Sequence, residues 1–216
     1  MPNWCYTRYE ATGKDAKRLY NLFEYASENA TLKTDFGPNW LGHLLLTVGV
    51  DEETVRTSRD RSIYCRGSIT DKSWDEKNGV FTFGVETAWE PMNGCIQTVI
   101  DRGNFDVEIE YFAVEDGNGV YEASSINMTE GMPYLVDADI SESQLEDYPA
   151  LAPVSQYGFT DEKTIRKVCV EMGCVSVITL DEMLEDLTDF CPDEDIICSI
   201  HKISFASPIR RSEVAA

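Results

Sequence analysis

The order in which strand and helix patterns follow one another constrains this fold more than any other feature of the sequence. Alternating apolar and polar residues predict strands, and apolar residues that recur every three or four positions predict helices. In the first half of the chain the predicted order is strand, helix, strand, strand, helix, strand. The corresponding ranges are 3–11, 15–28, 62–70, 80–88, 90–103 and 104–115.

This order is typical of two βαβ-like halves that share one sheet. We therefore expect an α+β fold with a ferredoxin-like βαββαβ antiparallel sheet and an insertion after the first helix. Residues 71–79 are expected to form a turn, because Asn78-Gly79 is a strong hairpin signal before an alternating strand. A further hairpin is predicted over 116–124, and an edge strand over 132–137.

Acidic residues are concentrated in the last third of the chain. Residues 137–195 contain 16 acidic and three basic side chains. The first part of the chain is only moderately acidic. We therefore divide the chain into a ferredoxin-like domain, residues 1–138, and an acidic C-terminal extension, residues 139–216, which is expected to pack on the first domain.

Apolar periodicity within the acidic extension predicts two helices and a strand. The first helix runs over 160–173 with Thr160 as its cap. The second begins at Thr179, where a capping-box pattern precedes an apolar face. A strand is expected over 196–205, and the polar tail 207–216 is expected to be frayed.

The formal net charge of -21 limits the classes of partner. Binding to a phosphate backbone or to an anionic membrane surface relies on Lys and Arg, so we expect a protein partner and neither nucleic acid nor membrane. No signal peptide is recognisable, and the longest apolar stretches, such as 44–50, are far shorter than the roughly 18 residues of a membrane-spanning helix. The seven irregularly spaced cysteines favour free thiols and a cytoplasmic location.

Residue types used in catalysis or metal binding form no recognisable pattern. The two histidines, His43 and His201, are expected to be packed or on the surface. The cysteine spacings do not fit a zinc site. A calcium-loop-like start at Asp137-x-Asp139 lacks the glycine and the final glutamate of such a loop. No phosphate-binding or nucleophile motif occurs, so no catalytic residue, metal or cofactor is expected.

Several short motifs occur in an order that resembles a known family. They are Pro2-Asn3-Trp4-Cys5, Gly37-Pro38-x-Trp40-Leu41-Gly42, Cys65-Arg66-Gly67, Thr87-Ala88-Trp89-Glu90-Pro91 and Gly117-x-Gly119-Val120-Tyr121. Together they resemble the Api-like, phage-associated proteins with a ferredoxin-like domain, over about residues 1–138. The resemblance implies a ferredoxin-like fold, a cytoplasmic setting and an origin in a phage or mobile element. It implies no activity, so no catalytic residue is carried over.

Three hypotheses of function remain open. The first is a non-enzymatic protein-interaction module, in which the motif residues Trp4, Trp40 and Trp89 are either structural anchors or a shared binding surface. The second is an acidic DNA mimic that inhibits a DNA-binding or restriction protein. The third is an enzyme with a carboxylate cleft, which requires a buried acid near His43 or His201. The acidic surface that motivates mimicry comprises Asp181, Glu182, Glu185, Asp186, Asp189, Asp193, Glu194 and Asp195.

Overall fold

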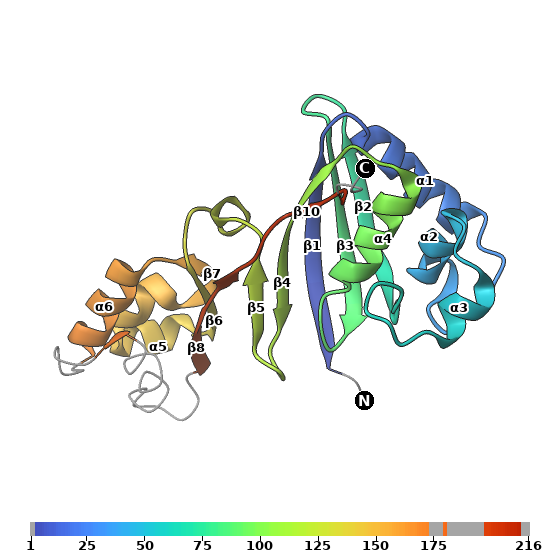
Figure 1. Ribbon diagram of the computed structural model, residues 1–216. Coiled ribbons are helices and arrows are strands. Elements are labelled where there is room, and N and C mark those ends of the chain that lie inside the picture. The colour runs from blue at the N-terminus through green and yellow to red at the C-terminus, as the bar shows by residue number, and fades with distance from the viewer. Residues whose placement is uncertain (1–2, 173–178, 181–196, 213–216) are drawn as a thin grey trace. The chain divides into compact units, whose positions relative to one another are not determined.

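The computed structural model describes residues 3–172, 179–180 and 197–212 of the 216-residue chain. Contacts within the chain divide it into two units. Unit 1 contains Met1–Ser125 and Ala206–Ala216, and unit 2 contains Ile126–Phe205. Each unit combines helices with antiparallel strand pairs (Figure 1). The expected α+β class with a mostly antiparallel sheet is therefore confirmed.

The sheet of unit 1 is built around β1 (Trp4–Thr12). This strand pairs with β3 (Val80–Ala88) along one edge and with β4 (Glu108–Glu115) along the other, antiparallel in both cases. Beyond β3 lies β2 (Gly67–Asp75), and beyond β4 lies β5 (Val120–Ala123). The strand order is therefore β2-β3-β1-β4-β5.

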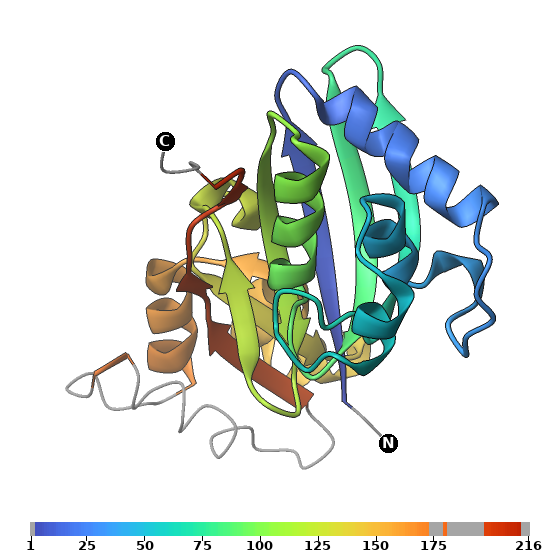
Figure 2. The ribbon, with the colours of Figure 1, turned by 45° about the vertical axis from the view of Figure 1, so that its right-hand side comes forward.

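Helices cover one face of this sheet, as Figures 1 and 2 show. α1 (Ala16–Glu28) connects β1 to the segment before β2, and α4 (Asn93–Gly103) connects β3 to β4. The segment between α1 and β2 forms the short 3-10 helix η1 (Gly37–Asn39) and the helices α2 (Gly42–Thr47) and α3 (Glu52–Thr57).

The sheet face under the helices carries an aromatic core. Tyr9, Phe81 and Phe83 alternate along β1 and β3 and are fully buried. Tyr9 and Phe83 stack with ring centroids 4.7 Å apart, and Phe23 of α1 meets Phe81 edge to face at 5.0 Å. Each such aromatic pair adds about 0.5–1.5 kcal/mol beyond the burial of its surface. The alternation of residues 80–88 therefore directs Phe81 and Phe83 into the core.

The second strand begins later in the chain than the predicted range of 62–70. β2 begins at Gly67 and continues to Asp75, through the stretch predicted as a turn. The register shifts between Ile69 and Asp71, so a bulge interrupts the alternation that the prediction used. The turn itself starts at Asp75, whose Oδ1 accepts hydrogen bonds from the backbone N–H groups of Lys77 and Asn78 at 2.9 and 3.1 Å.

The start of two other elements also differs from the prediction. α4 begins at Asn93, two residues after Pro91, where the sequence placed the first turn. β4 begins at Glu108 and not at Asn104, because Asn104 ends α4 in a left-handed conformation with a φ of 49°. The chain then needs a few extended residues before it joins the sheet.

Unit 2 has its own three-stranded sheet, in the order β7-β6-β8. The strands are β6 (Tyr134–Asp139), β7 (Gln156–Thr160) and β8 (Ile197–Lys202), followed by the short β9 (Ser204–Phe205). The helical elements are η2 (Ile126–Thr129), α5 (Glu142–Asp147), η3 (Pro149–Val154) and α6 (Glu162–Glu171). A separate apolar core includes Val136, Leu151, Ile165 and Val168, all buried.

Two predictions for unit 2 are wrong in detail. β6 was predicted as an edge strand, yet it is the central strand, paired with β7 and β8. The cap of α6 is Asp161, whose Oδ1 accepts a 2.7 Å hydrogen bond from the N–H of Thr164. Thr160 belongs to β7 instead. The helix predicted to begin at Thr179 lies outside the described residues after Leu180.

The C-terminal tail is ordered over its described residues and is not frayed. β10 (Ile209–Arg210) pairs antiparallel with β4, and Ile209 is buried in the core of unit 1. Gln97 of α4 donates to the carbonyl of Arg210 at 2.7 Å, and the N–H of Ser212 donates to Asp101 at 2.7 Å. Two paired residues are too few to show a period, so the sequence did not reveal this strand.

Replacing Ile209 by alanine is expected to lower the free energy of unfolding of unit 1 by about 2–4 kcal/mol, because a buried branched side chain is truncated. Denaturation followed by tryptophan fluorescence reports unit 1 alone, since all four tryptophans lie there. Arg210→Ala is the matched control. Its exposed ion pair with Glu108 contributes less than about 1 kcal/mol. Equal losses of unfolding free energy for both variants would contradict the burial of Ile209 in the core of unit 1.

Candidate functional site

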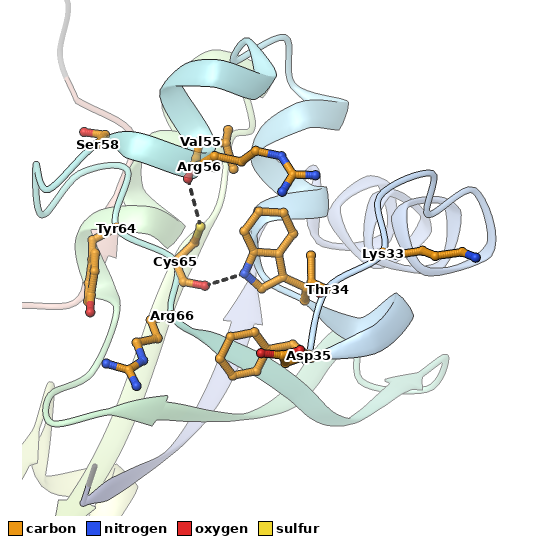
Figure 3. A pocket seen from close by; sticks show the side chains of 11 residues that line it. Lys33, Thr34, Asp35, Val55, Arg56, Ser58, Tyr64, Cys65 and Arg66 are labelled. Carbon is orange, nitrogen blue, oxygen red and sulfur yellow. Dashed lines mark hydrogen bonds between the residues drawn. The ribbon is translucent and has the colours of Figure 1, made fainter. Parts of the chain in front are cut away.

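The segment between α1 and β2, residues 29–66, contains a pocket of about 480 Å³. We call this segment the α1–β2 insertion. Every lining side chain comes from this segment (Figure 3). The contributing parts are the loop after α1, Trp40 directly after η1, α3 with the residue that follows it, and the residues before β2. The pocket is therefore a property of the insertion and not of the sheet.

Trp40 attaches the insertion to the start of β2. Its indole Nε1 donates a 2.8 Å hydrogen bond to the carbonyl of Cys65, and its backbone forms a bridge with Ser68. The ring is buried and packs closely on Gly42, where a Cβ atom would lie 2.5 Å from it. The N–H of Leu41 also donates to the carbonyl of Gly67 at 3.2 Å. These contacts hold one wall of the pocket in place.

Two buried side chains, Cys65 and His43, reinforce this wall. The thiol of Cys65 donates to the carbonyl of Val55 at 3.8 Å, and burial raises the pKa of this thiol to about 12. His43 Nδ1 donates to the carbonyl of Pro38 at 3.0 Å, and its ring meets Trp40 edge to face. Both contacts are structural, and the protonated Cys65 thiol is a poor nucleophile.

Positive charge lies around this pocket although the chain as a whole is strongly acidic. Figure 3 shows Arg56 and Arg66 on two sides of Cys65, whereas Lys33 extends away from the other labelled side chains. Arg56 Nε contacts Glu52 at 2.8 Å. Within the described part of the chain, Arg66 forms no ion pair. The hydroxyl of Thr34 is buried and has no hydrogen-bond partner among the same residues.

The three motif tryptophans differ in exposure. Trp40 is 7% exposed, whereas Trp4 and Trp89 keep 37% and 43% of their surface. Trp4 pairs across the sheet with Ala88, and the N–H of Trp89 donates to the carbonyl of Asn3 at 3.0 Å. Trp4 and Trp89 thus lie at the same end of β1 and β3. Together with Tyr6, which is 58% exposed, they form what we call the aromatic patch.

Trp89 adopts an unusual backbone conformation. Its φ is 75°, and the N–H of Glu90 donates to the carbonyl of Ala88 at 3.0 Å, which closes a three-residue γ-turn. A bulky residue with positive φ is strained by about 1–3 kcal/mol, and such strain occurs most often at functional sites. The turn is supported by Thr87, whose hydroxyl donates to the carbonyl of Glu90 at 2.7 Å.

The remaining predicted site residues do not form a site among the described residues. All eight acids of the predicted acidic surface, 181–195, lie outside the described residues. Among the residues with described side chains, the buried carboxylate is Glu115, which accepts hydrogen bonds from the N–H groups of Gly117 and Asn118 at 2.9 and 2.6 Å and so fixes the β4–β5 turn. His201 lies on β8 in unit 2. Across the described ranges, no group of three or more metal-ligating side chains could hold an ion.

Comparisons with known proteins do not assign the chain to a family: it matches no protein-family model, no curated protein and no solved structure. None of the described helices has the length and hydrophobicity needed to cross a bilayer. The site must therefore be interpreted from its own residues.

The cationic side of the pocket was missed at the sequence level, although a signal was present. Residues 54–66 contain four arginines and one acid, Asp60, in a chain of net charge -21. This local reversal of charge is visible without a structure. What the sequence could not show is that the loop after α1 closes the pocket opposite these residues.

The strain at Trp89 predicts that glycine at this position gives a more stable protein than alanine, the reverse of the order expected in a helix. Trp89→Gly should be more stable than Trp89→Ala by about 1 kcal/mol, because only glycine adopts positive φ without cost. The same pair at Tyr25, an exposed residue of α1, should show the opposite order by about 1 kcal/mol. Urea denaturation measures both differences, and the same order at both sites would contradict the strain.

The raised pKa of Cys65 predicts that this thiol resists alkylation in the folded protein. At pH 8.5 the side chain remains protonated, and only the thiolate reacts, so labelling by iodoacetamide should be at least about 100-fold slower than in the urea-unfolded chain. Mass spectrometry of the peptide that contains Cys65 measures the rate. Rapid labelling of the native protein would show that the thiol is accessible and ionised.

Proposed function

We propose that unit 1 has a ferredoxin-like fold with the α1–β2 insertion, and that the chain is an Api-like, phage-associated protein. The antiparallel order β2-β3-β1-β4, with α1 after β1 and α4 after β3, supports the fold. The finer description of residues 139–216 as an acidic extension is part of the same proposal, and the sequence composition supports it.

Contacts between the motifs support the family proposal. A Cβ atom on Gly117 would lie 1.9 Å from the side-chain nitrogen of Asn3, so these two motif residues touch only because residue 117 is glycine. Trp40 donates to Cys65, and Trp89 donates to Asn3. Motifs far apart in the sequence thus contact one another in pairs, as expected if they form one structural set.

We propose further that the protein is a non-enzymatic protein-interaction module that binds through the aromatic patch of Trp4, Tyr6 and Trp89. The observation that carries this proposal is the strained, half-exposed Trp89 beside a second exposed tryptophan. Trp and Tyr are enriched where interfaces gain most of their binding energy.

Charged groups border the patch in the manner of an interface rim. The hydroxyl of Tyr6 donates to Glu86 at 2.8 Å, and Glu90 forms an ion pair with Arg61 at 3.2 Å. Aromatic surface surrounded by carboxylates disfavours a phosphate backbone. The partner that fits is a protein with an apolar recess bordered by basic or neutral groups.

The double variant Trp4→Ser, Trp89→Ser is expected to lose partner binding at least about tenfold, because both exposed anchors are removed. Affinity capture from cells that encode the protein, quantified by mass spectrometry against the wild type, measures this loss. Tyr25→Ser is the control, since Tyr25 is an exposed aromatic residue outside the patch, on α1.

Circular dichroism and the fluorescence of the remaining tryptophans establish that the double variant is folded. The proposal fails if wild type and double variant capture the same proteins in the same amounts. It also fails if the purified chain turns over a substrate and the patch substitutions leave that turnover intact.

A further inference from the structure

The pocket of the α1–β2 insertion has the size of a small-molecule site. Its volume of about 480 Å³ falls within the range of roughly 300–1,000 Å³ found for such sites. A direct connection from α1 to β2 needs only a few residues, whereas the insertion supplies residues 29–66, and its side chains line this open pocket. The wall formed by Trp40 and Cys65 is fixed by hydrogen bonds, so the pocket is present without a ligand.

The charges of the pocket favour an anion. Arg56 and Arg66 both line it, and both are exposed. Arg66 has no ion-pair partner in the described residues, and Arg56 uses its Nε for Glu52, which leaves its terminal nitrogens available. Guanidinium groups bind phosphate with two parallel hydrogen bonds. Arg66, which forms no ion pair among the described residues of a chain of net charge -21, is therefore the group best placed to bind an anionic ligand.

Other lining groups favour a planar ring with hydrogen-bonding edges. Phe36, Trp40 and Tyr64 supply aromatic surface. The Thr34 hydroxyl is buried without a partner, which costs about 1–3 kcal/mol unless a ligand satisfies it. The carboxylate of Asp35, exposed and outside any ion pair of the described residues, can accept an N–H. These groups match the edge of a nucleobase.

We propose that this pocket binds a nucleoside monophosphate, with the phosphate near Arg66 and the base against the aromatic side chains. A single nucleotide fits the observations better than a polymer, because the acidic chain would repel a long phosphate backbone. The pocket adjoins the aromatic patch, because Phe36 of its lining meets Trp4 edge to face with ring centroids 6.4 Å apart. The two proposals nevertheless name different ligands and are tested by different variants, so failure of the nucleotide proposal would leave the protein-interaction proposal untouched.

The test titrates the purified full-length chain with AMP, GMP, CMP and UMP, using calorimetry and tryptophan fluorescence, to which Trp40 in the pocket wall contributes. Adenosine and inorganic phosphate serve as separate probes for the ring and the anion. At least one nucleotide should bind, and each of the two fragments should bind at least tenfold more weakly.

Arg66→Gln should weaken nucleotide binding at least tenfold. Arg59→Gln should change it less than twofold, because Arg59 is an equally exposed arginine of the same segment that does not line the pocket. Tyr64→Leu should weaken nucleotide binding and leave phosphate binding unchanged. Circular dichroism verifies that each variant is folded.

Three results would overturn the proposal. The first is no binding of any of the four nucleotides at about 10 mM, well above the concentration at which even weak ligands bind. The second is an equal effect of Arg66→Gln and Arg59→Gln, which would indicate unspecific attraction. The third is phosphate binding as tight as nucleotide binding, which would leave the aromatic surface without a role.

Discussion

Unit 1 depends on the pairing of β1 along both of its edges. Because β3 and β4 fix its register, every second residue from Cys5 to Ala11 is buried under the helices, and the residues between them face the other side of the sheet. A slip by one residue would exchange the two sets. The same strand therefore positions Tyr9 in the core and presents Trp4 and Tyr6 at the surface, so packing and the aromatic patch share one constraint.

The α1–β2 insertion both extends the core of unit 1 and carries the pocket. The hydrogen bond from Trp40 to the carbonyl of Cys65 holds the middle of the insertion against its C-terminal end, beside the first residues of β2. The intervening helices α2 and α3 bury Leu44, Leu45 and Val55 against the rest of unit 1. Charged residues remain on the outside of this added layer, where substitution carries little risk for folding.

The sequence predicted elements well wherever a regular period continued to the end of the element. β3 matches its predicted range of 80–88 residue for residue, and the α+β class follows from the alternation of strand and helix patterns. Predictions failed where single contacts override a period. A bulge after Ile69 interrupts the alternation in β2, so its predicted range was wrong. The carboxylate of Asp161 caps α6, whereas Thr160 was predicted to do so.

The candidate site was predictable only in part, for a similar reason. Tryptophans in short motifs indicated positions of interest, but no local pattern distinguishes the buried Trp40 from the exposed Trp4 and Trp89. The positive φ of Trp89 is a tertiary feature that no propensity for tryptophan suggests. The pocket requires three stretches of the insertion to meet in space, and no local pattern encodes such a meeting.

The return of β10 to unit 1 has a consequence for the biogenesis of the protein. The chain leaves unit 1 at Ser125, forms unit 2, and re-enters at Ala206, whose N–H donates to the carbonyl of Ala123 at 2.9 Å. The exit and entry points are thus neighbours, as in a domain inserted into a loop. During synthesis, Ile209 is added only after all of unit 2 has been made, so the core of unit 1 that β10 completes can form in full only after the whole of unit 2 has been synthesised.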